Sequence, residues 1–325
     1  NADLALDIVS DILMNSTFDA EELARERAVV LQEIGQANDT PDDIIFDTFQ
    51  ETAYPGQPLG RAILGTTDIV GEMPREALVD YIGAQYGAER MVLAAAGNLD
   101  HDRLVGLAEK AFAGVSRSSA PAPAPANYTG GDSREIRELE QAHLVMGFDG
   151  IGFDDDDYYP LAVLSTALGG GMSSRLFQEV REKRGLVYSI YTFSSAYQDG
   201  GLFGLYAGTG EDEVAELISV VCDEMKKVAA DPLAEDEITR ARAQIKAGVL
   251  MSLESTSSRA ERIARHLQVY DRVIPVEEIA ARIDSVSAED IRRVARRLLA
   301  SAPTMAALGP VGRLEEYSSV KGRLA

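Results

Sequence analysis

The sequence predicts an α+β fold of two tandem homologous domains, each a mainly antiparallel sheet covered by helices. The first observation is an internal repeat, in which residues 18–34 align with residues 233–249 at an offset of 215 positions. The second is a further repeat, in which residues 74–97 resemble residues 287–309 at an offset of 212–213 positions. The third is an alternation of short apolar runs, typical of strands, with stretches of period 3.6, typical of helices.

The second copy of the repeat begins near residue 134 and has the clearest order of elements. Apolar or alternating runs predict its strands, and amphipathic periodicity predicts its helices. The expected strands are 143–148, 186–195, 202–207 and 305–308. The expected helices are 156–168, 173–183, 211–229, 234–252, 256–270, 275–283 and 288–299.

The first copy contains only the back half of this order. Its expected helices are 3–14, 19–37, 42–53, 75–86 and 101–112, and its expected strand is Met91–Ala96. The repeat offset would start this copy about 80 residues before residue 1. We therefore expect the first domain in this sequence to lack its N-terminal strands and one helix.

A segment rich in Pro, Ala, Ser and Gly separates the two copies at residues 116–133. This composition cannot build a packed core and is typical of a semi-rigid linker. The expected domain map is therefore 1–115 for the back part of the first domain, 116–133 for the linker and 134–325 for the second domain.

The formal net charge of −22 argues against a nucleic-acid partner, which demands a basic surface. It leaves two interpretations open: solubility alone, or attraction of basic peptides. The longest apolar runs are too short to span a membrane. No secretory signal is recognisable, and we expect a cytoplasmic location, with the periplasm or an organelle left open. The single cysteine, Cys222, excludes an internal disulfide and is expected to be a buried thiol.

Two glutamates appear in the first copy of the repeat but not in the second. Glu26 aligns with Ala241, and Glu33 aligns with Gly248. The fold therefore does not require either acid, which makes both candidates for chemistry. Their spacing of seven residues puts them on one helix face, two turns apart.

This face has two interpretations. The carboxylates could provide a metal ligand and a supporting partner for it. Alternatively they belong to a solvated surface that Arg25 and Arg27 neutralise.

Several long stretches together resemble one family of zinc peptidases. In the first half these are EELARERAVVLQEI, PGQPLGRAILGT (55–66) and MVLAAAGNLDHDRL (91–104). In the second half they are AHLVMGF (142–148) and LGGGMSSRLFQEVREKRGLVYSIY (168–191). They are similar, in this order and over essentially the whole chain, to the pitrilysin, insulysin and mitochondrial-processing-peptidase family, in its two-domain bacterial form.

The resemblance implies a zinc site. Members of this family bind Zn²⁺ through the histidines of a His-x-x-Glu-His helix, whose glutamate is the general base. A distant downstream glutamate completes the site, and by resemblance this metal ligand is Glu33, with Glu26 in the supporting position.

The sequence departs from this pattern because it contains no His-x-x-Glu-His. Its three histidines, His101, His143 and His266, are isolated and are expected to be structural. One carboxylate cannot hold a catalytic zinc, which takes three protein ligands. The motif helix is therefore expected in the absent front of the first domain, and this chain is expected to be inactive alone.

The resemblance also implies that Arg181 and Tyr188 contact the substrate. A guanidinium and a phenol are good donors to a developing oxyanion. The alternative is structural, with Arg181 capping a helix C-terminus and Tyr188 packing on a sheet.

Two further motifs lie near this pair. The run Gly169, Gly170 and Gly171 is by itself a helix stop, but by resemblance it forms a short substrate-binding loop. The acidic run 154–157 is expected to be solvated.

The first functional hypothesis is a zinc metalloendopeptidase that hydrolyses unfolded peptides or short polypeptides. The second is a non-catalytic partner or scaffold subunit with the same fold, and a peptide-binding module is a weaker third. Because family members with four domains separate the zinc helix from the Arg/Tyr pair, a two-domain chain is expected to dimerise with itself or with a homologous subunit.

Overall fold

The computed structural model describes residues 2–117, 121 and 124–325. It divides into two compact units, which are described separately. The helical unit comprises Asn1–Gly35, Leu64–Ala124 and Ser252–Val273. The sheet unit comprises Gln36–Ile63, Pro125–Met251 and Ile274–Ala325.

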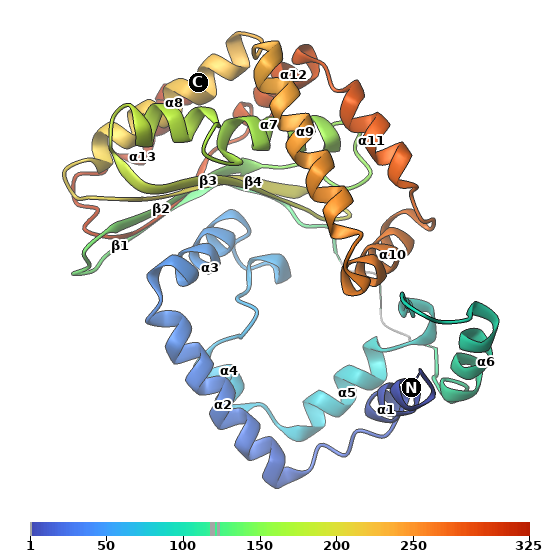
Figure 1. The fold of residues 1–325 in the computed structure, drawn as a ribbon. Coiled ribbons are helices and arrows are strands. Elements are labelled where there is room, and N and C mark those ends of the chain that lie inside the picture. Colours follow the sequence, from blue (N-terminus) through green and yellow to red (C-terminus); the bar gives the residue numbers. More distant parts are fainter. Residues whose placement is uncertain (1, 118–120, 122–123) are drawn as a thin grey trace. The chain divides into compact units, whose positions relative to one another are not determined.

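The sheet unit is built on one mixed sheet of five strands (Figure 1). Its strands are β1 (Gly131–Ile136), β2 (Ala142–Asp149), β3 (Val187–Ala196), β4 (Gly201–Thr209) and β5 (Thr304–Gly309). Their order is β1-β5-β2-β4-β3, with β1 parallel to β5 and the other pairs antiparallel. The predicted α+β class is therefore confirmed, and β3 forms one edge of the sheet.

Helices cover both faces of this sheet (Figure 1). One face carries α7 (Tyr158–Gly169) and α12 (Ala288–Leu299), with α8 (Val214–Ala230) and α13 (Tyr317–Leu324) in the same layer. The other face carries α3 (Pro41–Ala53), whose Ile45 and Phe49 are buried against Val145 and Tyr206. A helix that the repeat assigns to the first copy therefore packs on the sheet of the second.

Within its described residues, the helical unit contains five further α-helices and the first part of α2. Their bounds are α1 (Ala2–Met14), α2 (Ala20–Asn38), α4 (Thr67–Glu72), α5 (Arg75–Gln85), α6 (His101–Ala111) and α10 (Thr256–Tyr270). The predicted strand Met91–Ala96 is wrong, because these residues have no regular secondary structure. A strand needs a partner for its backbone hydrogen bonds, and no second sheet occurs in the described part of the chain.

The sheet unit also contains α9 (Glu235–Ser252) and α11 (Val276–Ser285), close to their predicted bounds. β1 was not predicted, and it begins inside the expected linker 116–133. Glycines at its start are typical of a turn, and for this reason the sequence did not predict a strand here. In the structure Gly130 and Gly131 adopt φ values of +70° and +153°, which favour glycine. Residues 118–120 and 122–123 of the linker lie outside the described residues.

One side-chain contact recurs at both copies of the repeat. Nη2 of Arg27 donates to the carbonyl of Met73 at 2.5 Å, at the entrance to α5. Arg242, which aligns with Arg27, donates in the same way to the carbonyl of Val286, at the entrance to α12. The same arginine therefore ties a long helix to the start of a later one in each copy.

The single cysteine and the three histidines lie in regular secondary structure of the described chain. Cys222 is fully buried on α8, as predicted, and burial raises the pKa of its thiol to about 12. His143 lies in β2 and is hydrogen-bonded to Tyr206, while His266 is buried in α10.

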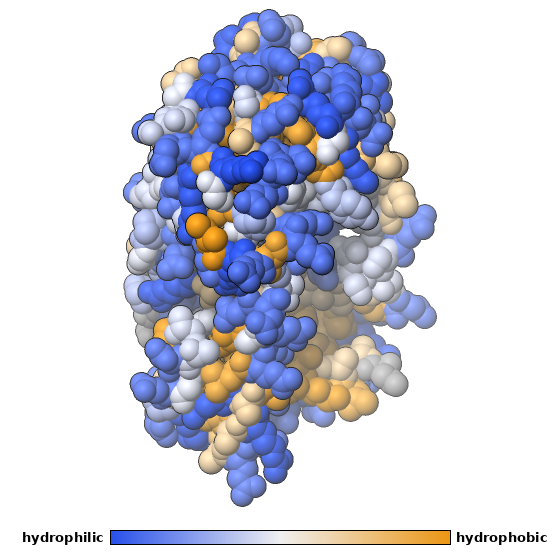
Figure 2. Space-filling view, turned by 90° about the vertical axis from the view of Figure 1, so that its left-hand side faces the viewer, coloured by the Kyte–Doolittle hydropathy of each residue, from blue (hydrophilic) through white to orange (hydrophobic). Residues whose placement is uncertain are grey.

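Hydrophilic side chains cover most of the face shown in Figure 2. Among the described helices, none has the length and apolarity to cross a membrane.

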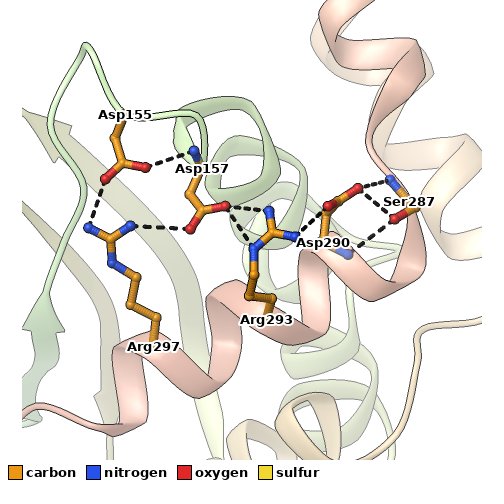
Figure 3. A network of polar contacts seen from close by, with 6 residues as sticks. All are labelled: Asp155, Asp157, Ser287, Asp290, Arg293 and Arg297. Carbon is orange, nitrogen blue, oxygen red and sulfur yellow. Dashed lines mark hydrogen bonds and ion pairs between the residues drawn. The ribbon is translucent and has the colours of Figure 1, made fainter.

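The acidic run 154–157 is solvated only in part, because Asp154 and Asp156 are exposed as expected but Asp155 and Asp157 are not. Asp157 is only 7% exposed, and Asp155 is half-buried. Both accept hydrogen bonds or ion pairs from arginines of α12, as Figure 3 shows. The cost of burying these carboxylates is offset by paired guanidinium groups, which sequence spacing alone did not indicate.

Candidate functional site

The structure brings Arg181 and Tyr188 together. Cζ of Arg181 lies 5.3 Å from the centroid of the Tyr188 ring and 4.9 Å from the centroid of the Phe177 ring. These distances are within the range of a cation–π contact. The two residues that the family resemblance pairs are therefore neighbours in space, and Phe177 is a third member that sequence reasoning missed.

Two backbone irregularities position this group. Phe177 and Arg181 lie on a π-helical turn, η3 (Phe177–Glu182). Gly185, with φ of +66°, ends the turn in the left-handed conformation, and its amide donates to the carbonyl of Arg181 at 3.0 Å. π-helical turns are rare and frequently occur at functional sites.

The second irregularity is a β-bulge at Tyr188. Val187 pairs with Thr209 and Ser189 pairs with Gly208, so Tyr188 is the extra residue of β3. A bulge re-aims the side chain that it carries. Tyr188 is accordingly 73% exposed and does not pack on the sheet.

The guanidinium of Arg181 is free of polar partners among the described residues. Glu179, two residues before Arg181 on the same turn, pairs with Lys183, and the nearby Arg184 pairs with Glu216 at 3.3 Å. An unpaired guanidinium keeps up to five N–H donors available. The pair can therefore donate hydrogen bonds to a carbonyl oxygen from outside.

The outer edge of β3 lies beside this pair. β3 ends the strand order: β4 pairs with its inner edge, and no strand of the described chain pairs with its outer edge. A free edge presents backbone N–H and C=O groups to which an extended peptide can add as a strand. Arg181 and Tyr188 stand at the point where β3 begins.

An aromatic and acidic face lies on the α3 side of β3 and β4. Tyr191 and Tyr206 are cross-strand partners whose rings stack at 5.1 Å. Burial raises the pKa of Tyr206 to about 12, and the charge of Asp42 adds to this. Burial also raises the pKa of Asp47, with Asp43 contributing. Sequence reasoning missed this face, although the acidic start of α3 was a signal for it.

Glu26 and Glu33 lie on α2 in the helical unit, and both are exposed without a polar partner in the described chain. The alternative of a neutralised surface is not supported at either glutamate. Arg25 pairs with Glu22 at 2.5 Å instead, and Arg27 binds a backbone carbonyl.

The residues present do not by themselves fit a zinc ion. Glu33 is an accessible carboxylate, which is a suitable ligand type, but a catalytic zinc takes three protein ligands. Across residues 2–117, 121 and 124–325, no group of three His, Cys, Asp or Glu side chains could hold a metal.

Two of the three glycines at the end of α7 are required for steric reasons, since a side chain would not fit there. A Cβ on Gly169 would lie 2.6 Å from the backbone nitrogen of Thr192, and one on Gly170 would lie 2.7 Å from the carbonyl oxygen of Thr166. Gln244 also donates to the carbonyl of Gly170 at 2.7 Å. Only Gly171 is exposed with room for a side chain, so a substrate-binding role stays a prediction.

Two models of one protein family together match nearly all of the first three quarters of the chain. Residues 72–245 match a model described as "Peptidase M16 inactive domain". Residues 1–67 match a model described as "Insulinase (Peptidase family M16)". The family expected from the sequence is thereby confirmed.

Similar proteins occur in distant bacteria. A protein of Rickettsia felis named "Uncharacterized zinc protease" is 37% identical over 95% of this chain and 75% of its own length. Bacillus subtilis "Uncharacterized zinc protease YmxG" is 33% identical over 97% of this chain and 77% of its own length.

Two solved structures have the same fold. A chain of "Complex III2 from Candida albicans, Inz-5 bound" has a TM-score of 0.90 at 19% identity, over 100% of this chain and 79% of its own. "The crystal structure of a protease from Helicobacter pylori" has a TM-score of 0.87 at 20% identity, over 95% of this chain and 77% of its own.

Proposed function

Because the chain belongs to the M16 (insulinase/pitrilysin) family of peptidases, we propose that it acts as a zinc-dependent metalloendopeptidase on unfolded peptides or short polypeptides. The observation that carries this proposal is the unpaired guanidinium of Arg181 over the exposed ring of Tyr188, beside the free edge of β3. This arrangement suits an extended peptide backbone, which unfolded chains offer and folded proteins do not.

The peptide would add to β3 through main-chain hydrogen bonds. Arg181 N–H groups and the Tyr188 hydroxyl would then donate to a carbonyl oxygen of the peptide. Preorganised donors of this kind stabilise the negative charge that develops on that oxygen during hydrolysis. Gly169, Gly170 and Gly171 would border the same peptide, with Gly171 accessible to it.

The proposal assigns one zinc ligand, Glu33, and one supporting carboxylate, Glu26, to this sequence. The histidine ligands and the general base are assigned to a His-x-x-Glu-His helix outside these 325 residues. The zinc proteases to which the chain is similar support zinc as the metal.

Basic peptides are the proposed class of substrate. The net charge of −22 attracts them at long range. At short range, Asp43 and Asp47 lie on the first turns of α3, on the sheet face that also carries Tyr191. A lysine or arginine of a peptide on β3 would find carboxylates and an aromatic ring there.

The proposed assembly is a dimer in the cytoplasm, of two copies or of this chain with a homologous subunit. A non-catalytic partner subunit is the second candidate function. It is favoured by the match of residues 72–245 to a model described as an inactive domain.

The test uses the natural full-length chain and a fluorogenic unfolded peptide. We expect hydrolysis that a chelator abolishes and added zinc restores. R181A and Y188F should each lower kcat by about 100-fold, the cost of losing one oxyanion donor. R184A is the matched control, because Arg184 is exposed on the same segment and pairs with Glu216.

Equal activities of R181A and R184A would refute the contact role. A chain that has the complete metal motif, binds zinc and still hydrolyses nothing would favour the partner-subunit function.

A further inference from the structure

Phe177 lies one helical turn before Arg181, and its ring is the nearer of the two aromatic rings to the guanidinium. The distance from Cζ of Arg181 is 4.9 Å to the Phe177 centroid and 5.3 Å to the Tyr188 centroid. Residues four positions apart on a helical turn share a face, so the contact follows from backbone geometry. Phe177 is half-buried, and its ring is not part of the buried core.

An arginine with no polar partner has many rotamers of similar energy. The side chain of Arg181 has no hydrogen bond or ion pair within the described chain, and Glu179 on the same turn is bound to Lys183. Two aromatic rings of the described chain contact its guanidinium and restrict it. Since Tyr188 is itself exposed on a bulge, the better-anchored ring is that of Phe177.

An aromatic ring positions a guanidinium differently from a carboxylate. A carboxylate would occupy two N–H donors and neutralise the charge. A ring attracts the cation through its π face and has no acceptor atom that competes for the donors. Phe177 therefore restrains Arg181 while leaving its N–H groups available to a peptide carbonyl.

We propose that Phe177 is a positioning residue that holds Arg181 in its peptide-binding orientation through the face of its ring. The inference rests on the proposed function and goes beyond it by adding a residue that acts only through Arg181. Aromaticity at position 177, and not apolar volume, is the property that matters.

The test is a double-mutant cycle in the natural full-length chain. Peptide binding is measured by the anisotropy of a fluorescein-labelled basic peptide on chelator-treated protein, and kcat and KM are measured with zinc. F177L should lower kcat/KM roughly 2- to 30-fold, the range of cation–π contacts, with kcat falling as it does in R181A and with Kd rising. F177Y should stay within about twofold of wild type. In an R181A background, F177L should have no further effect.

A second measurement does not depend on peptide. The Arg181 Nε–Hε resonance should be displaced by ring currents, should move in F177L and should remain close to its wild-type position in F177Y. Unchanged resonance and unchanged Kd in F177L would overturn the inference, as would an equal effect of F177L with and without R181A.

Failure of the proposed function has a different signature. If R181A leaves peptide binding and hydrolysis unchanged, the contact role of Arg181 is lost. The resonance of Arg181 then still decides whether Phe177 holds the guanidinium.

Discussion

Arg293 donates two hydrogen bonds, from Nε at 3.2 Å and Nη2 at 2.5 Å, to one carboxylate oxygen of the buried Asp157. Arg297 donates to the other oxygen at 3.2 Å and to Asp155 at 2.8 Å (Figure 3). Arg293 also reaches Asp290, which closes a capping box with Ser287 at the start of α12. One network thus joins the loop before α7 to the first three turns of α12.

This network predicts that D157N destabilises the sheet unit. The substitution leaves two guanidinium groups without their shared carboxylate. We expect a loss of about 2–3 kcal/mol in unfolding free energy, below the ~3–5 kcal/mol of fully buried pairs, because both arginines are about half-exposed. Urea unfolding measures the loss. D156N is the control, since Asp156 is exposed and should change stability by less than about 0.5 kcal/mol.

The same carboxylates predict a dependence of stability on pH. Burial raises the pKa of Asp155, but hydrogen bonds from Arg297 and the Asp157 amide outweigh it, and the pKa is lowered overall. Hydrogen bonds from Ser287 lower the pKa of Asp290. A carboxyl whose folded pKa is depressed stabilises the protein above its unfolded pKa of about 3.9, and this contribution is lost as pH falls through the folded value.

Unfolding free energy should therefore fall as pH drops below about 4, and D155N and D290N should each flatten that decline. Denaturant titrations between neutral and acidic pH measure it. Equal slopes in wild type and both variants would show that other carboxylates dominate acid unfolding.

The glycine run predicts that substitution of Gly169 lowers stability, whereas substitution of Gly171 weakens peptide binding. G169A should cost about 1–3 kcal/mol, because its Cβ would overlap the backbone of Thr192. G171A should leave stability within about 0.5 kcal/mol, since its Cβ would be no nearer than 3.7 Å to another atom. If Gly171 borders the peptide, G171A should raise KM without changing the thermal midpoint. Unchanged KM would leave the run a helix stop only.

Helices with a strong apolar stripe could be predicted from the sequence, and isolated strands could not. Periodicity located α10, α11 and α12 within one or two residues, because an amphipathic helix satisfies its own backbone. It failed for Met91–Ala96, where an apolar run has no strand beside it, and for β1, which has little apolar character. Pairing partners decide a strand, and they lie far away in the sequence.

Some residues of the candidate site could likewise be identified from the sequence, and one could not. Arg181 and Tyr188 could be identified from the sequence because a resemblance carried their roles. Phe177 could not, since a phenylalanine on an amphipathic helix is ordinary core material by pattern alone. Its significance comes from a π-helical turn and a bulge, which no periodicity indicates.

The proposed roles of the two glutamates on α2 predict different losses of zinc when each is substituted. With the complete metal motif present, E33Q should lose zinc and activity while keeping its fold, because Gly248 occupies the aligned position in the second copy. E26Q should weaken zinc binding about 10- to 100-fold, as expected for a supporting partner. Metal analysis and circular dichroism give the two readouts. Equal zinc content in E33Q and wild type would remove Glu33 from the site.

Mixing two variant chains tests whether one active site uses residues from two chains. If Glu33 of one chain works with Arg181 and Tyr188 of its partner, E33Q and Y188F chains should each be weak alone. Equal mixing with free exchange makes half of the dimers hybrid, and each hybrid has one intact site of two. The mixture should therefore recover about a quarter of wild-type activity, a proportion set by the two-fold symmetry of the dimer. If both features act within one chain, every hybrid site carries a defect. Activity would then stay at the average of the two variants, despite subunit exchange confirmed by mass spectrometry.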